Sequence, residues 1–338
     1  MEKNQIGDDD VLMGFGYDNN FLKEKAHPDK RVLDMVTTKL PIVIVHVSAH
    51  LACVNSKALE IAGITADTPN PDGGLIGRLE DGREPSGYLE ETGMMSIREK
   101  VLSRVKSTPK DIMAGISKNY IMHGVTTMQD GATTESDIEL LKAMADANAF
   151  KVDVIAYPLM PQGGVEIFHN NKEYCGKYVN HLKIGGYKLV LDGSPQGRTA
   201  WLTKPYKAGD FGYCGYPWMK DDEVEKFLKM AVEEKQQVLT HCNGDAAGNQ
   251  LLTAYEKVMK ETGSKDDLRP VMIHCQTVRT DQLDRMAKLN MVASMFVGHT
   301  YYWGDVHLKN LGEERGSYIS PARDALDMLL YRFFEFSI

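Results

Sequence analysis

Three short apolar runs in the second half of the chain each end in a side chain that can bind a metal ion. Polar groups at the carboxyl ends of successive buried strands are typical of a (β/α) barrel, because the loops on that rim converge on one axis. The pattern therefore predicts an α/β fold that carries an enzyme active site. The runs are Tyr187–Leu191 before Asp192, Gln237–Thr240 before His241, and Pro270–Ile273 before His274.

Strand-like and helix-like segments alternate from residue 109 onward, and the strands are rich in Val, Ile and Leu. Such alternation favours a parallel sheet flanked by helices. Residues 106–338 are predicted to form six β/α units of an incomplete (β/α)8 TIM barrel, and 333–338 starts one more strand. The predicted helices are 109–122, 134–148, 221–235, 245–262 and 280–289, and the further predicted strands are 123–130, 152–157 and 291–296.

Residues 1–105 have a different character. They combine a short predicted strand at 40–46, a predicted helix at 55–62 and a turn-rich stretch at 68–74 that is punctuated by Pro and Gly. No regular β/α alternation is visible there. We therefore expect a separate α+β subdomain over 1–105 and the barrel domain over 106–338.

Composition limits the partners and the location of the chain. Its formal charge is -8, and no continuous basic segment occurs, which argues against nucleic acid and anionic membranes. No apolar run of about 18 residues or more is present, and the N-terminus has no apolar signal region, so a cytoplasmic location is expected. The five scattered cysteines suit reduced thiols, and Cys242 and Cys275 are expected to be packing residues.

Reasoning from the residues alone leaves two questions open, one about the orientation of Lys188 and one about the role of His241 and His274. Lys188 either points into the barrel, where a buried ammonium without a partner is costly, or points outward along a helix. His241 and His274 stand 33 residues apart, which is one β/α unit, and they either share a metal or are separate core or surface residues. Imidazole and carboxylate ligands suit zinc, and manganese, iron or nickel are compatible.

Several segments resemble the amidohydrolase superfamily, and within it the branch of N-substituted formamide deformylase-like, metal-dependent TIM-barrel hydrolases. The resemblance covers nearly the whole chain. It rests on VSAHLACVNSKALEIAGI (47–64), GYKLVLDGSPQGRTAWLTKPY (186–206), VLTHCNGDAAGNQLLTAYEKV (238–258) and the segment 269–305, which contains both VMIHCQ and GHTYYWGD.

The resemblance implies a hydrolase that cleaves a carbon–nitrogen bond other than a peptide bond with a metal-activated water. It implies that Lys188 is carboxylated and binds a divalent metal, zinc, together with His241 and His274. It further implies that Asp192 orients the lysine end of the site and that His299 faces the substrate. His50 would reach the pocket from an inserted subdomain, 1–105.

The sequence also departs from the family pattern. No His-x-His pair occurs, although the family holds its metals with one on the first strand. The catalytic aspartate of the family lies in a His-x-Asp-x-Pro motif that would follow Phe334–Ile338, and so beyond Ile338. A chain truncated at both ends is therefore expected.

Three hypotheses remain. The first is a portion of a metal-dependent hydrolase for a small amide-type substrate, and the second is an inactive relative kept for binding or regulation. The third is a doubly wound α/β binding protein, against which the absence of a Gly-x-Gly-x-x-Gly motif counts. An open barrel exposes unpaired strand edges, so pairing with a second copy of the chain, as a homo-oligomer, is a further expectation.

Overall fold

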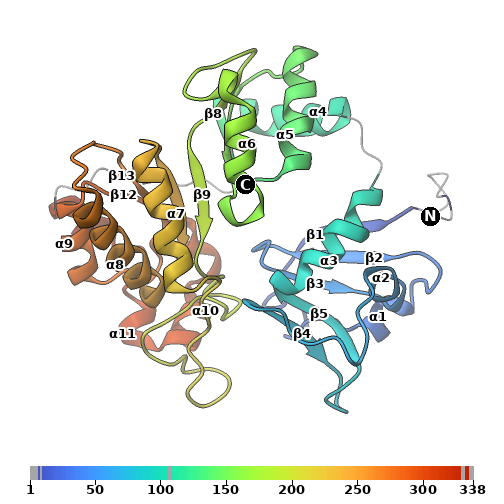
Figure 1. The fold of residues 1–338 in the computed structure, drawn as a ribbon. Helices are drawn as coiled ribbons and strands as arrows, with labels where there is room; N and C mark the ends of the chain where they lie inside the picture. Colours follow the sequence, from blue (N-terminus) through green and yellow to red (C-terminus); the bar gives the residue numbers. More distant parts are fainter. Residues whose placement is uncertain (1–6, 8–9, 106–108, 329–331, 335–338) are drawn as a thin grey trace. The chain divides into compact units, whose positions relative to one another are not determined.

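The chain falls into two structural units, each with its own core. The computed structural model describes residues 7, 10–105, 109–328 and 332–334 (Figure 1). The first unit comprises 1–106, 193–200 and 215–218, and the second comprises 107–192, 201–214 and 219–338. The sequence analysis placed the two short segments 193–200 and 215–218 in the second domain, whereas the structure groups them with the first unit.

The first unit is built on a mixed five-stranded sheet. Its first two strands pair in parallel, and the remaining neighbours pair antiparallel. The strand order is β1 (Leu12–Tyr17), β2 (Ile42–His46), β3 (Leu51–Val54), β5 (Pro85–Glu91), β4 (Gly74–Arg78). The helices are α1 (Lys30–Asp34), α2 (Ser56–Ala62) and α3 (Met95–Lys100), with 3-10 turns at Thr92–Met94 and Leu102–Arg104.

Helix α2 confirms the predicted helix at 55–62, and its ends explain why it forms. The Asn55 side chain accepts a hydrogen bond from the backbone N–H of Ala58, which caps the first turn. Gly63 ends the helix in the left-handed conformation, with φ 76°, where a glycine has no steric penalty. Leu59 and Ala62 face the core of the unit, together with Val43 from β2.

The second unit contains two parallel sheets. A five-stranded sheet has the order β13 (Arg332–Phe334), β12 (Val292–Met295), β11 (Val271–His274), β10 (Val238–Cys242), β9 (Tyr187–Val190). A three-stranded sheet has the order β6 (Thr127–Thr133), β7 (Asp153–Pro158), β8 (Leu182–Ile184). An isolated parallel bridge joins Leu159 to Lys188.

Helices separate these strands along the chain, and α7, α8 and α9 lie side by side in sequence order (Figure 1). The helices are α4 (Pro109–Met122), α5 (Glu135–Asp146), α6 (Gly164–Asn170), α7 (Asp221–Glu233), α8 (Asp245–Thr262), α9 (Thr280–Lys288), α10 (Gly298–Leu311), α11 (Glu313–Gly316) and α12 (Ala322–Asp327). Two 3-10 turns are Met160–Gln162 and Lys172–Tyr174. No helix in the described ranges is both long and apolar enough to cross a membrane.

The predicted alternation of strands and helices with parallel pairing is confirmed. The sequence did not predict β8 or α6, which lie between the predicted strands of β7 and β9. The expected strand at 333–338 is described only to Phe334, where β13 pairs in parallel with β12, and residues 335–338 lie outside the described residues. The described strands do not form a closed barrel, so the barrel itself stays a prediction.

One apolar cluster draws on both parallel sheets. Tyr157 of β7 packs in it with Leu239, Val271 and Ile273 of β10 and β11, and Val292 of β12 completes it. Neighbouring residues in register on parallel strands point to the same face of a sheet. The side chains in register with this cluster therefore lie on the face where the strands share a core.

Candidate metal site at the strand ends

The three predicted side chains Asp192, His241 and His274 lie at the carboxyl ends of β9, β10 and β11, three neighbouring strands of one sheet. All three strands are parallel, so their carboxyl ends meet at one edge. This is the arrangement that the sequence predicts.

The imidazoles of His241 and His274 contact each other directly. Nδ1 of His241 lies 3.1 Å from Nε2 of His274, and the ring planes are 76° apart. Two nitrogen ligands of a tetrahedral zinc ion, each at about 2.0–2.1 Å from the metal, are separated by about 3.3 Å. Both rings therefore fit one metal ion with only a small movement apart.

His274 reaches this position through an unusual backbone. In the strand register it pairs with Cys242, and a regular strand would direct it to the face opposite His241. His274 and Cys275 instead adopt φ values of 75° and 50°, in the left-handed region that L-residues rarely occupy. Backbone of this kind costs of order 1–3 kcal/mol per residue and concentrates at functional sites. The turn brings the imidazole back to His241.

Asp192 holds the loop after β10 in place. Its Oδ1 accepts a hydrogen bond from the backbone N–H of Asn243 at 2.9 Å, and its Oδ2 accepts from those of Gly244 and Trp201 at 2.6 and 3.0 Å. The carboxyl group is fully buried, and Oδ1 lies 3.7 Å from Nε2 of His241. The Asn243 side-chain amide lies 3.0 Å from the same Nε2. Asp192 and Asn243 therefore orient the His241 ring through Nε2, and Nδ1 is left to face His274.

Lys188 is buried, with 5% of its surface exposed. It pairs in register with Leu239, which belongs to the cluster shared by the parallel sheets, and Val190 pairs with His241. Lys188 thus lies on the same face as His241. Of the two orientations considered for Lys188 in the sequence analysis, the register agrees with the inward one.

His299 lies at the start of α10 and is 4% exposed. Its Nδ1 is 3.0 Å from Nε2 of His307, a fully buried residue of the same helix that the sequence analysis did not single out. Burial, together with the smaller effects of the neighbouring imidazoles of His307 and His274, lowers the pKa of His299 to about 2.

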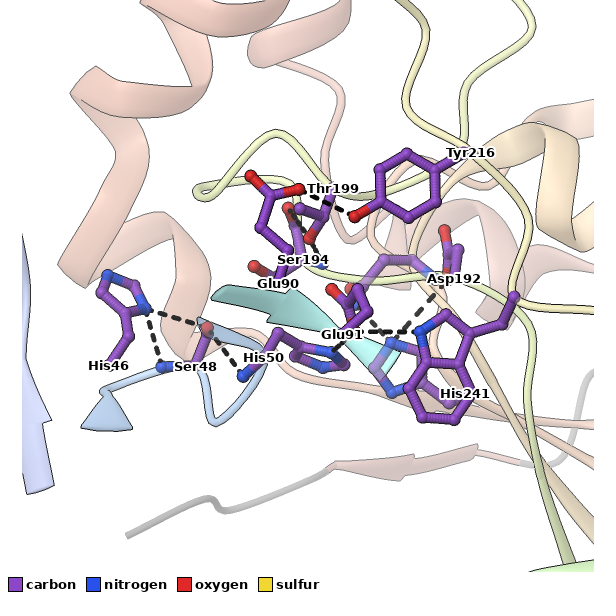
Figure 2. A network of polar contacts seen from close by, with 12 residues as sticks. His46, Ser48, His50, Glu90, Glu91, Asp192, Ser194, Thr199, Tyr216 and His241 are labelled. Atoms are coloured by element: carbon purple, nitrogen blue, oxygen red, sulfur yellow. Dashed lines mark hydrogen bonds and ion pairs between the residues drawn. The ribbon is translucent and has the colours of Figure 1, made fainter. Parts of the chain in front are cut away.

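His50 belongs to the first unit, where its Nδ1 lies 2.7 Å from Oε2 of Glu91 (Figure 2). The indole N–H of Trp218 donates to the same oxygen at 3.0 Å. Glu91 is 2% exposed and has a φ of 49°, and a Cβ at position 193 would overlap its other oxygen, so Gly193 is required there. The sequence analysis missed Glu91, although two adjacent carboxylates at the end of a buried strand were a usable signal.

A metal centre needs more than two imidazoles. Within the described ranges, no three His, Cys, Asp or Glu side chains converge closely enough to hold an ion. A carboxylated Lys188 would add a carboxylate from the neighbouring strand, which is a ligand type that zinc accepts. The donor set of His241, His274 and Lys188 fits a divalent metal on these grounds. Cys242 and Cys275 are buried and donate to backbone carbonyls, as expected of packing residues.

The fold is an α/β fold with parallel sheets, and it brings two histidines together at the ends of neighbouring strands. The sequence profile of the amidohydrolase family matches residues 2–328, so the chain belongs to the amidohydrolase family. The superfamily predicted from the motifs is thereby confirmed.

Individual relatives agree with this membership. The chain is 27% identical over 317 residues to YtcJ of Bacillus subtilis, a provisionally named amidohydrolase, and covers 58% of it with 92% of its own length. It is 28% identical over 314 residues to the protein LONG AFTER FAR-RED 3 of Arabidopsis thaliana, and 90% of the chain covers 53% of that protein. It is 25% identical over 329 residues to an N-substituted formamide deformylase of Arthrobacter pascens, and 94% of the chain covers 59% of that enzyme. The chain thus spans little more than half the length of these relatives.

Two solved structures share the fold. They are uncharacterised metal-dependent hydrolases from Pyrococcus furiosus and Pyrococcus horikoshii, each with a TM-score of 0.69. The first is 23% identical, and 98% of the chain covers 65% of it. The second is 24% identical, and 96% of the chain covers 62% of it.

Proposed function

We propose that the protein is a metal-dependent hydrolase that cleaves a carbon–nitrogen bond of a small amide-type substrate. The observation that carries the proposal is the 3.1 Å contact between Nδ1 of His241 and Nε2 of His274 at adjacent strand ends of an amidohydrolase family member. The name of the formamide deformylase of Arthrobacter pascens supports the bond type.

The proposed metal ligands are His241, His274 and a carboxylated Lys188, with zinc as the ion. A divalent metal held there would lower the pKa of a bound water and polarise the scissile carbonyl. The buried carboxyl group of Asp192 and the amide of Asn243 would keep the His241 ring at the angle that ligation needs, as partners of ligating histidines generally do. His299 would bind the substrate, and the apolar cluster below the strand ends would exclude water from beneath the site.

The proposed architecture is a partial TIM barrel formed by the parallel strands, with 1–105 as an inserted α+β subdomain that includes His50. The apolar cluster supports this architecture because it joins Tyr157 of the three-stranded sheet to strands of the five-stranded sheet. The shared fold of the two Pyrococcus hydrolases supports it as well. A cytoplasmic location and pairing with a second copy stay predictions.

The metal site is tested by elemental analysis of the purified chain. We expect a stoichiometric divalent metal in the unaltered protein and none in the His241→Ala, His274→Ala double variant. The matched control is the His123→Ala, His181→Ala double variant, which removes two exposed imidazoles and should keep the metal. Metal retained by the first double variant, or absent from the unaltered protein, would overturn the proposed site.

The lysine and the reaction need separate measurements. Intact-mass analysis under native conditions should show one carbon dioxide adduct that is lost in Lys188→Met and kept in Lys183→Met. Hydrolysis is measured on a panel of N-substituted formamides, other amides, cyclic ureas and esters. Metal bound at His241 and His274 without turnover of any amide would favour the second hypothesis, an inactive binding relative.

A further inference from the structure

His307 forms a buried imidazole pair with His299 and has no part in the proposed metal site. Nδ1 of His299 and Nε2 of His307 are 3.0 Å apart, and the two rings are within 18° of parallel. Both residues lie on α10, and His307 is fully buried. Phe296 and Trp303 pack against the His299 ring with centroid separations of 5.0 and 4.8 Å.

A straight helix would not allow this contact. Eight residues of α-helix rise about 12 Å, which is further than two imidazole side chains can bridge. The backbone of Trp303, midway between the two histidines, leaves the helical region with φ -133° and ψ 18°. The kink therefore brings the two halves of α10 together so that the imidazoles meet.

Both rings are neutral at physiological pH. Burial lowers the pKa of His307 to about 4, and burial together with the imidazoles of His307 and His274 lowers that of His299 to about 2. A neutral imidazole carries one proton, on either Nδ1 or Nε2. The contact between the two rings therefore contains one proton, and its position fixes the tautomers of both residues.

The surroundings of His307 favour one of the two arrangements. Its Nδ1 is buried and has no hydrogen-bond partner among the described residues. If His299 donated its Nδ1–H, the proton of His307 would lie on this buried Nδ1 and remain an orphaned donor. If His307 donates its Nε2–H instead, Nδ1 keeps only an unused lone pair, and under-used acceptors are tolerated better than orphaned buried N–H groups.

We propose that His307 is a positioning residue that donates its Nε2–H to Nδ1 of His299 and thereby holds His299 in the tautomer protonated on Nε2. His299 then offers a fixed N–H donor to the carbonyl oxygen of the amide substrate. The tautomer assignment stands on the geometry of α10, the buried Nδ1 of His307 and the neutrality of both rings. The role toward substrate rests on the proposed function.

The tautomer is measured directly by nitrogen NMR of the full chain labelled with 15N-histidine. The chain has ten histidines, and the His299 signals are assigned by their loss in His299→Gln. We expect a protonated Nε2 and an unprotonated Nδ1 at His299 in the unaltered protein. The opposite pattern, with the proton on Nδ1, overturns the proposal whether or not the protein hydrolyses any substrate.

Two variants at position 307 separate positioning from packing. His307→Phe fills the space but has no donor, and His307→Gln keeps an N–H near the position of Nε2. With a substrate from the amide panel, we expect His307→Phe to lower kcat and kcat/KM together by roughly 10²-fold, as removal of a fixed donor to a developing oxyanion does. His307→Gln should restore most of this loss.

Equal activity of the two variants, with folding verified by circular dichroism, would overturn the substrate role. Absence of turnover in the unaltered protein, together with a protonated Nε2 at His299, would mean that the proposed function fails while the positioning by His307 stands.

Discussion

Replacement of Asp192 tests how the candidate site is held together. The buried carboxyl group accepts backbone hydrogen bonds from Trp201, Asn243 and Gly244. In Asp192→Asn, the side-chain oxygen can take the place of Oδ2 and keep the bonds from Trp201 and Gly244. The NH2 group then faces the N–H of Asn243, and one bond to a charged acceptor is lost, at a cost of about 1.5–3 kcal/mol.

Asp192→Ala removes all three acceptor contacts. Each orphaned backbone N–H costs about 1–3 kcal/mol, so the total is roughly 3–9 kcal/mol. Native domains are commonly stable by only about 5–15 kcal/mol. We therefore expect this variant to fold poorly or to have an unfolded second unit. The order of stability should be the unaltered chain, then Asp192→Asn, then Asp192→Ala.

The assay is urea unfolding followed by far-ultraviolet circular dichroism, with the midpoint and the slope fitted for each variant. Asp284→Asn is the matched control, since Asp284 is exposed on α9 and an exposed substitution changes stability by less than about 0.5 kcal/mol. Stabilities of Asp192→Asn and Asp192→Ala within that range of the control would refute the reasoning that Asp192 anchors the loop after β10.

Two further predictions concern packing and acid stability. In Gly244→Ala, the new Cβ would overlap the carbonyl oxygen of Trp201, so a loss of about 1–3 kcal/mol in urea unfolding is expected, whereas Gly131→Ala, at a position with open space, should change little. Burial lowers the pKa of His307 from 6.5 to about 4, so its neutral ring contributes stability above pH 6.5 that is lost as the pH falls towards 4. Thermal unfolding of His307→Phe should therefore vary less with pH across that window, and an unchanged dependence would contradict the assignment.

Local pattern was enough to predict much of the second unit. The apolar runs that became β9, β10 and β11 are rich in branched residues and end in polar groups, which a reader of the sequence can see without any distant contact. The helix boundaries at 109–122 and 245–262 are those of α4 and α8. The first unit was less predictable, since its sheet mixes parallel and antiparallel pairs whose partners are not set by any regular alternation along the chain.

The sequence by itself determined the family, the parallel α/β architecture and the placement of His241 and His274 at adjacent strand ends. These follow from motifs and from periodicities that neighbouring residues impose on one another. Only the tertiary structure decided that His274 turns back to His241, because the strand register would place it on the other face and a left-handed backbone reverses that.

The contact between His299 and His307 was likewise decided by the tertiary structure, because the two residues meet only where α10 departs from helical geometry at Trp303. Residues eight apart in a helix carry no signal of contact in the sequence. Backbone conformations of this kind are stabilised by packing around them, and for that reason they are determined by the folded chain rather than by any local segment.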